Sequence, residues 1–244
     1  MALQHLRVPW SSPPSGNARV ASWLNGRRVR VWMPGGDPRF MVPASTAVQR
    51  VGRYGQELRN GTSFVSNLAI SPEPDAVYEC WLVVLGSTVP TGVSNSLLLA
   101  DTAITGNGLG VVSTTVRVRA SSSYVLTTNL VPQPYEPIFV VLRQGDYRVY
   151  QRGAKFTSAS GNVVAPSRLG LGLSGMSLAL AVRFTNSTPA DDEIRALVSN
   201  PWQVFERRVF VSGPLGPALP ALSQPTFVPG SLTAFGFRPR VTAS

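Results

Sequence analysis

Short runs of β-branched and aromatic residues, each closed by turn-forming residues, recur along most of this 244-residue chain. Residues 28–33 (RVRVWM) alternate with a period of two before the turn-rich segment 34–38 (PGGDP). The runs 138–143 and 147–152 are separated by a short loop with a glycine at 145, which predicts a β-hairpin. Comparable runs lie at 77–85, 109–119, 124–129, 178–184 and 203–212. This pattern predicts an all-β chain built from many short antiparallel strands.

A single segment, 188–199, has the pattern of an α-helix. Thr188 is a preferred N-cap residue and Pro189 suits the first helical position. The acidic residues 191–193 lie in the first turn, where the helix dipole favours negative charge. The apolar residues of 194–198 share one face, and a proline at 201 prevents continuation. We therefore expect one short amphipathic helix late in the chain.

The composition is that of a folded protein with a substantial core. Hydrophobic residues make up 43% of the chain, with five Trp and ten Phe, and charged residues only 14%. No stretch approaches the roughly 18 to 20 consecutive apolar residues of a membrane-spanning helix, and the first 26 residues lack a signal-peptide core, so we expect no membrane association. The lone cysteine, Cys80, lies in an apolar run, which predicts a buried, unreactive thiol.

The chain carries a formal charge of +10, and Lys155 is its only lysine among 22 basic residues. The arginines are dispersed without a block of five or six, which argues against a specific nucleic-acid-binding arm. Two interpretations of the charge remain. The arginines are solvated side chains that also pair at interfaces, or they attract polyanions such as phosphorylated lipopolysaccharide or an acidic neighbouring protein.

Catalytic chemistry has few candidate residues. His5 is the only histidine, so neither a serine- or cysteine-type triad in the core nor a Cys/His metal site can be built. Glycosidases use two carboxylates facing one groove, and no expected strand carries a pair two residues apart. We therefore expect no enzymatic activity and no cofactor, although Asp101 or Asp146 could contribute to a calcium site.

Sugar binding is harder to exclude, since it needs only an aromatic platform and a few polar groups. Tyr135, Tyr147 and Tyr150, with Arg152, are candidate glycan or interface contacts around the expected hairpin. The alternative is that these aromatic rings fill the core of a β-sandwich.

The two ends of the chain differ from its middle, and we expect three parts. These are an N-terminal arm at 1–26, a β-domain at 27–206 and an extended C-terminal arm at 207–244. The ends are rich in Pro, Gly and Ser yet keep isolated aromatic residues, which linkers seldom carry. The candidate anchors of the arms are Trp10, Phe227, Phe235 and Phe237.

Residues 192–205 (DEIRALVSNPWQVF) resemble the ending of laminin-G-like, concanavalin A-like jelly-roll domains in structural proteins of tailed bacteriophages. The segments 7–14 (RVPWSSPP) and 24–32 (LNGRRVRVW) resemble the lead-in and first strand of the same group, so the likeness covers about 7–206. Asn200, Pro201, Trp202 and Phe205 match the ending and are expected to pack the short helix onto the sandwich. Relatives often carry Asp where Arg152 stands, which argues against carrying over a calcium or sugar site.

The resemblance implies a two-sheet antiparallel jelly-roll sandwich with one short helix near 188–199. It also implies a virion structural protein, either a capsid decoration protein or a component of a tail fibre or baseplate, assembled in the bacterial cytoplasm. The expected partners are further copies of the chain, bound through the arms, other virion proteins, and polysaccharide of the host surface. The alternatives are a stand-alone lectin-like module and, less favoured by the carboxylates, a glycoside hydrolase.

Overall fold

The computed structural model describes fourteen stretches of the chain. They are residues 4–14, 18–24, 27–34, 48–59, 66–69, 79–92, 96–100, 107–120, 123–143, 145–161, 166, 168–171, 176–185 and 187–211. Within them the chain forms seventeen β-strands, one α-helix and short 3-10 turns. None of the described helices has the length and apolarity needed to span a bilayer.

The largest sheet has eight antiparallel strands. The long strand β16 (Ser177–Thr185) pairs along one edge with β7, and along the other with β5 and then β3. The remaining strands extend the sheet on both sides. Its members are β14 (Ala154–Ser158), β13 (Tyr147–Gln151), β12 (Pro137–Leu142), β7 (Glu79–Leu85), β16, β5 (Gly55–Arg59), β4 (Val48–Gly52) and β3 (Arg28–Trp32).

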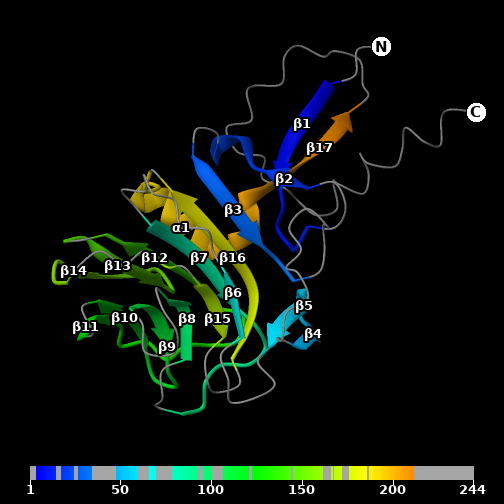
Figure 1. Cartoon of the computed structure of the whole chain (residues 1–244). Helices are drawn as coiled ribbons and strands as arrows, with labels where there is room; N and C mark the ends of the chain where they lie inside the picture. Colours follow the sequence, from blue (N-terminus) through cyan, green and yellow to red (C-terminus); the bar gives the residue numbers. More distant parts are fainter. Residues whose placement is uncertain are drawn as a thin grey trace, which may run out of the picture.

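A six-stranded antiparallel sheet stacks on this one (Figure 1). Its order is β11 (Ser123–Thr127), β10 (Val116–Ala120), β9 (Gly108–Val111), β8 (Ser96–Ala100), β15 (Arg168–Leu171) and β6 (Ser66–Ala69). Alternate side chains of the two sheets meet in one buried cluster, as in other β-sandwiches. The expected two-sheet antiparallel jelly-roll sandwich with one short helix is confirmed.

A second buried cluster covers the opposite face of the eight-stranded sheet. It is built against α1 (Asp191–Ser199), the 3-10 turn η3 (Pro201–Val204) and the 3-10 turn η1 (Ser22–Leu24). Strands β7 and β16 therefore lie between two cores, and each of their residues is buried. This explains why both segments are almost continuously apolar in the sequence instead of alternating.

A small third sheet joins the two ends of the described chain. Strand β17 (Phe205–Val211) is its centre, with β1 (Gln4–Pro9) on one side and β2 (Arg19–Val20) on the other. Figure 1 shows β1 and β17 extending away from the sandwich together. The expected arm at 1–26 thus contributes two strands and the turn η1, and the expected boundary at 206/207 falls inside β17.

Two local expectations are corrected by the structure. The helix begins at Asp191, so its N-cap residue is Ala190 and not Thr188, and Pro189 lies outside the helix. The Ala190 N–H donates to Glu193 Oε2 (2.8 Å), which fixes the start of the helix at this position. The run 109–119 is two strands, β9 and β10. They turn between Val112 and Thr115, where the Val112 N–H donates to the Thr115 carbonyl (3.0 Å).

Candidate functional site

The turn of the β4–β5 hairpin holds a cation and an aromatic ring. Gly52 pairs with Gly55, so Arg53 and Tyr54 form a two-residue turn. Arg53 is exposed, whereas Tyr54 is half-buried and packs against the second core. The Gly52 side of the turn has no room for a side chain, since a Cβ there would lie 1.7 Å from Glu57 Oε1. The Glu57 side chain, whose Oε2 accepts from Ser87, therefore packs directly against the Gly52 backbone.

Tyr135 reaches this turn from the loop between β11 and β12. Its backbone has a φ of 63°, a conformation that non-glycine residues seldom adopt. The Arg53 N–H donates to the Tyr135 hydroxyl (2.9 Å), and the Tyr135 ring meets Tyr54 edge to face with centroids 5.2 Å apart. Tyr54 makes a second edge contact with Trp202 of η3 at 5.1 Å. Three segments distant in the sequence are thus fastened together by aromatic rings.

The Arg53 guanidinium lies over both tyrosines. Its Cζ is 5.4 Å from the centroid of the Tyr54 ring and 6.0 Å from that of Tyr135, both within the range of a cation–π contact. No ion pair of Arg53 occurs with any carboxylate of the described residues. We call Arg53, Tyr54 and Tyr135 the tyrosine–arginine cluster. It offers two half-buried rings, a phenol oxygen and an exposed guanidinium at one place.

Arg152 supports the same loop from its other side. Its Nε donates to Glu136 Oε1 (2.8 Å), and a terminal nitrogen donates to the Val131 carbonyl. The buried Glu136 in turn accepts from the Gln133 N–H (2.7 Å). Of the predicted contacts, Tyr135 and Arg152 are therefore brought to one loop, where Arg152 holds the backbone that presents Tyr135.

The other two predicted contact residues are buried, which corrects their expected accessibility. Tyr147 lies in the first core and Tyr150 in the second, both with almost no exposed surface. Burial raises the pKa of both phenols, and in Tyr150 the hydrogen bond to Asp191 raises the pKa further. The alternation of β13 puts the two rings on opposite faces of a sheet that is covered on both sides, so neither ring can contact a glycan.

The conspicuous residues of the segment 192–205 pack the body of the protein. Asn200 Oδ1 accepts from the Trp202 N–H (3.2 Å), and Asn200 Nδ2 donates to the Trp10 carbonyl (3.3 Å). Trp202 and Phe205 are buried in the second core, and Pro201 begins η3. Trp10 is half-buried against the same core. The other predicted arm anchors, Phe227, Phe235 and Phe237, lie outside the described residues.

Each described carboxylate except the exposed Asp192 of the first helical turn makes at least one structural bond, and one further oxygen, Glu57 Oε1, is buried without a hydrogen-bond partner. Both oxygens of Asp146, a candidate calcium ligand, accept from Arg148 (2.5 and 2.7 Å), and Asp101 lies outside the described residues. In the described part of the chain no three His, Cys, Asp or Glu side chains gather as a metal site would require. The other engaged carboxylates are Glu57 with Ser87, Glu79 with Arg183, Glu136 with Arg152, Asp191 with Lys155, Glu193 with Arg27 and Glu206 with the Ser22 N–H.

Cys80 is confirmed as a buried thiol. It lies in the second core with its Sγ 3.6 Å from the Thr188 hydroxyl. Burial raises its pKa to about 12, so the reactive thiolate is scarce at neutral pH.

Sequence reasoning missed Arg53 and Tyr54. The available signal was the spacing Gly52-Arg53-Tyr54-Gly55 between two short runs that can pair as a hairpin. The contacts with Tyr135 and Trp202 join residues 82 and 148 positions away from the turn, and no local pattern records such pairings.

No protein-family model matches the chain, and no curated protein matches it significantly. Solved structures with a similar arrangement include a Trypanosoma rangeli sialidase (16% identity, TM-score 0.46, covering 67% of this chain and 29% of that one). Others are the binding domain of botulinum neurotoxin DC in complex with SialylT (11%, 0.43, 71% and 46%) and the carbohydrate-binding module CBM66 from Bacillus subtilis (9%, 0.34, 59% and 91%). The chain thus spans less than a third of the sialidase. At such identities, function has to be argued from the residues of the chain itself.

Proposed function

We propose that this chain is a non-catalytic carbohydrate-binding module and that the tyrosine–arginine cluster is its sugar contact. The observation that carries the proposal is the presentation of Tyr54 and Tyr135 at a hairpin tip, with Arg53 beside both rings. Tyrosine combines an apolar ring face with a polar end, and arginine supplies several N–H donors. Sugars require that combination, because their rings have apolar C–H faces and hydroxyl-lined edges.

Binding without catalysis is supported by the state of the carboxylates. A glycosidase generally keeps two of them facing its substrate. Close to the cluster, Glu57 accepts from the Ser87 N–H and hydroxyl (2.8 and 2.7 Å), and Glu136 is held by Arg152. Both carboxylates are buried, and among the described residues no hydrogen bond joins either of them to Tyr54 or Tyr135.

A glycan array of the full-length chain tests the sugar-binding proposal. We expect binding to at least one glycan, and a loss of at least about tenfold in affinity for Tyr135→Ala, since aromatic anchors dominate small contacts. Arg53→Ala is the second variant, because Arg53 is exposed and its removal leaves the packing of Tyr54 on Trp202 intact. Tyr124→Ala is the matched control, an exposed tyrosine on the six-stranded sheet. Silence on the array, or equal losses for the control, would reject this site.

The finer part of the proposal is location. We infer that the module acts on the surface of a tailed-bacteriophage particle, as a homo-oligomeric capsid decoration protein or a tail-fibre or baseplate component. The support is the resemblance of residues 192–205 and 7–14 to such proteins. Quantitative mass spectrometry of separated capsids and tails tests it. A constant ratio to the capsid protein would indicate decoration, co-purification with tails would indicate a fibre or baseplate, and absence from both would favour a stand-alone lectin.

A further inference from the structure

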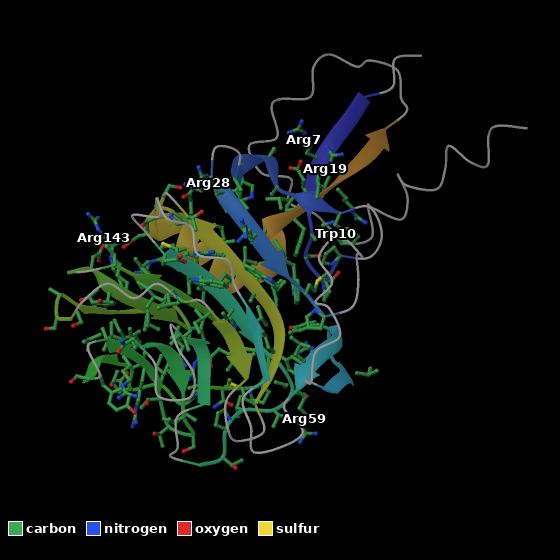
Figure 2. The ribbon with its side chains drawn as sticks, in the orientation of Figure 1. Arg7, Trp10, Arg19, Arg28, Arg59 and Arg143 are labelled. Atoms are coloured by element: carbon green, nitrogen blue, oxygen red, sulfur yellow. The ribbon has the colours of Figure 1, made fainter. Side chains whose placement is uncertain are left out.

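The three-stranded sheet is rich in positive charge. Four arginines lie on its strands against one carboxylate, that of Glu206; they are Arg7, Arg19, Arg207 and Arg208. Figure 2 labels Arg7 and Arg19 on this sheet, with Trp10 at its base where β1 ends. Opposite charges are therefore scarce here, and the sheet attracts anions.

The one carboxylate of this sheet, Glu206, contacts Arg7 and the Ser22 N–H. Glu206 Oε2 accepts from the Ser22 N–H (2.8 Å), and Oε1 lies 3.9 Å from Arg7 Nε. Successive side chains of a strand point to opposite faces, so Glu206 and Arg207 lie on different sides of β17. Glu206 accordingly does not neutralise Arg207.

Arg207 stacks on Trp10 with its Cζ 4.9 Å from the centroid of the ring. Two donors at this contact, Arg207 Nε and Trp10 Nε1, are buried and have no hydrogen-bond partner, whereas both side chains keep part of their surface exposed, which leaves a route of approach. A third buried donor without a partner, Gln203 Nε2, belongs to η3, which is tied to Trp10 through Asn200. The Trp10–Arg207 contact therefore holds two of these N–H donors, one of them on a charged group, and supplies neither with an acceptor.

Such an arrangement is costly unless something accepts those bonds. A buried donor without an acceptor destabilises the fold, and a charged one does so more strongly. A group that satisfies these two donors must carry both a negative charge and hydrogen-bond acceptor atoms. A carboxylate does both, since its two oxygens match the planar fork of a guanidinium.

We propose that Trp10 and Arg207 form a carboxylate-binding site, in which a carboxylate accepts from Arg207 Nε and Trp10 Nε1. The carboxylate comes from an acidic side chain of a partner polypeptide or from a free organic acid. The site is separate from the tyrosine–arginine cluster and does not depend on sugar binding.

The test follows the indole N–H signals of the full-length, ¹⁵N-labelled protein by NMR. The Trp10 signal is identified by its loss in Trp10→Phe, and the other four tryptophans act as internal references. The protein is titrated with a short peptide carrying one Glu, with the same peptide carrying Gln, and with sodium acetate against sodium chloride at equal ionic strength. We expect a saturable shift of the Trp10 signal with the Glu peptide and none with the Gln peptide.

The peptide and acetate titrations together distinguish the two sources of the carboxylate, a partner polypeptide and a free organic acid. A saturable acetate shift means that a free carboxylate is sufficient, whereas binding of the Glu peptide alone means that a polypeptide presents it. No saturable shift with either compound overturns the proposal.

Substitutions tie the signal to Arg207. Arg207→Gln should weaken binding by at least about tenfold, because the charge and the fork are both lost. Arg207→Lys keeps the charge without the fork and is used if the first variant does not fold; it should also bind more weakly. Arg19→Gln removes an equal charge from the neighbouring strand β2 and should leave binding unchanged. Equal affinities for the Arg207 and Arg19 variants would overturn the assignment.

Discussion

Arg183 and Glu79 form an ion pair inside the sandwich, with 1% and 4% of their surfaces exposed. Arg183 Nε and Trp81 Nε1 both donate to Glu79 Oε2 (3.0 Å each), and the guanidinium Cζ lies 5.7 Å from the Trp81 ring. Trp32 stacks on Trp81 with centroids 5.3 Å apart. A charge can be buried here because each partner satisfies the other's hydrogen bonds.

Removing one partner of this pair should cost more stability than removing both. Arg183→Met leaves a buried carboxylate without its cation, and we expect a loss of about 3–5 kcal/mol in the free energy of unfolding. The double variant Arg183→Met/Glu79→Gln should recover part of that loss. Urea denaturation of the four proteins of this cycle provides the measurement. Additive losses would mean that the two side chains do not act as a pair.

At the scale of elements, α1 is fastened to the sheet at its first residue. Asp191 accepts from the Tyr150 hydroxyl (2.7 Å) and from Lys155 Nζ (2.6 Å), so the helix start is bound to β13 and β14. The hydrogen bonds from Lys155 and Tyr150 lower the pKa of Asp191, and the bond to Asp191 raises the pKa of Lys155. Charge thus fixes the position of a helix whose apolar face alone could slide.

These shifts predict a dependence of stability on pH. A lowered carboxyl pKa stabilises the fold above the unfolded-state pKa, so stability should fall as the pH drops below about 4. The raised pKa of Lys155 predicts a second decline above about pH 10, as the ammonium loses its proton. Asp191→Asn should reduce both the low-pH and the high-pH decline of the free energy of unfolding, measured by urea denaturation at a series of pH values. Asp192→Asn, an exposed neighbour in the same turn, is the control, and identical profiles for the two variants would contradict this role.

Asn200 links the 3-10 turn η3 to Trp10 at the end of β1, and a matched pair of substitutions tests this link. Its Oδ1 caps η3 and its Nδ2 holds the Trp10 carbonyl, so Asn200→Ala should cost about 0.5–2 kcal/mol in the free energy of unfolding. Asn200→Asp keeps the capping oxygen but replaces the donor with an oxygen that repels the Trp10 carbonyl, so its loss of stability reports the Trp10 contact separately from the cap. Denaturant unfolding ranks the two variants, and a larger loss for Asp would show that the Trp10 bond dominates.

At the scale of the whole molecule, the N-terminal segment is part of the second core. Its buried residues there are Ala18, Ala21 and Leu24. The backbone N–H of Trp10 donates to the Phe205 carbonyl (3.1 Å). Deletion of residues 1–26 should therefore uncover apolar surface and abolish cooperative unfolding, because the buried Val8 and Leu24 contribute about 1.5–3 kcal/mol each and β17 loses both of its partner strands. Calorimetry on the truncated protein is the measurement. Trp23→Ala is the control, since that side chain is partly exposed, and a cooperative transition after truncation would mean that the arm is dispensable.

Much of the fold could be predicted from local patterns. The hairpin of β12 and β13 was expected from two apolar runs and a glycine-containing loop, and Ile138 indeed pairs with Gln151. The short strands β4, β5, β6, β8, β14 and β15 were not expected, because each is only four or five residues long and lacks a long run of β-branched and aromatic residues. Of the candidate site, Tyr135 was expected and Arg53 and Tyr54 were not.

The all-β class, the single late helix and the buried thiol follow from the order of the amino acids alone, since each depends on periodicity or capping within about ten residues. The accessibility of the tyrosines depends on the packing of the sheets, because β13 alternates between two covered faces that no local pattern distinguishes. The tertiary structure also brings Arg53 to Tyr135 and Arg207 to Trp10. Those contacts join residues far apart in the chain, and their position is fixed by sheet register and packing against a shared core.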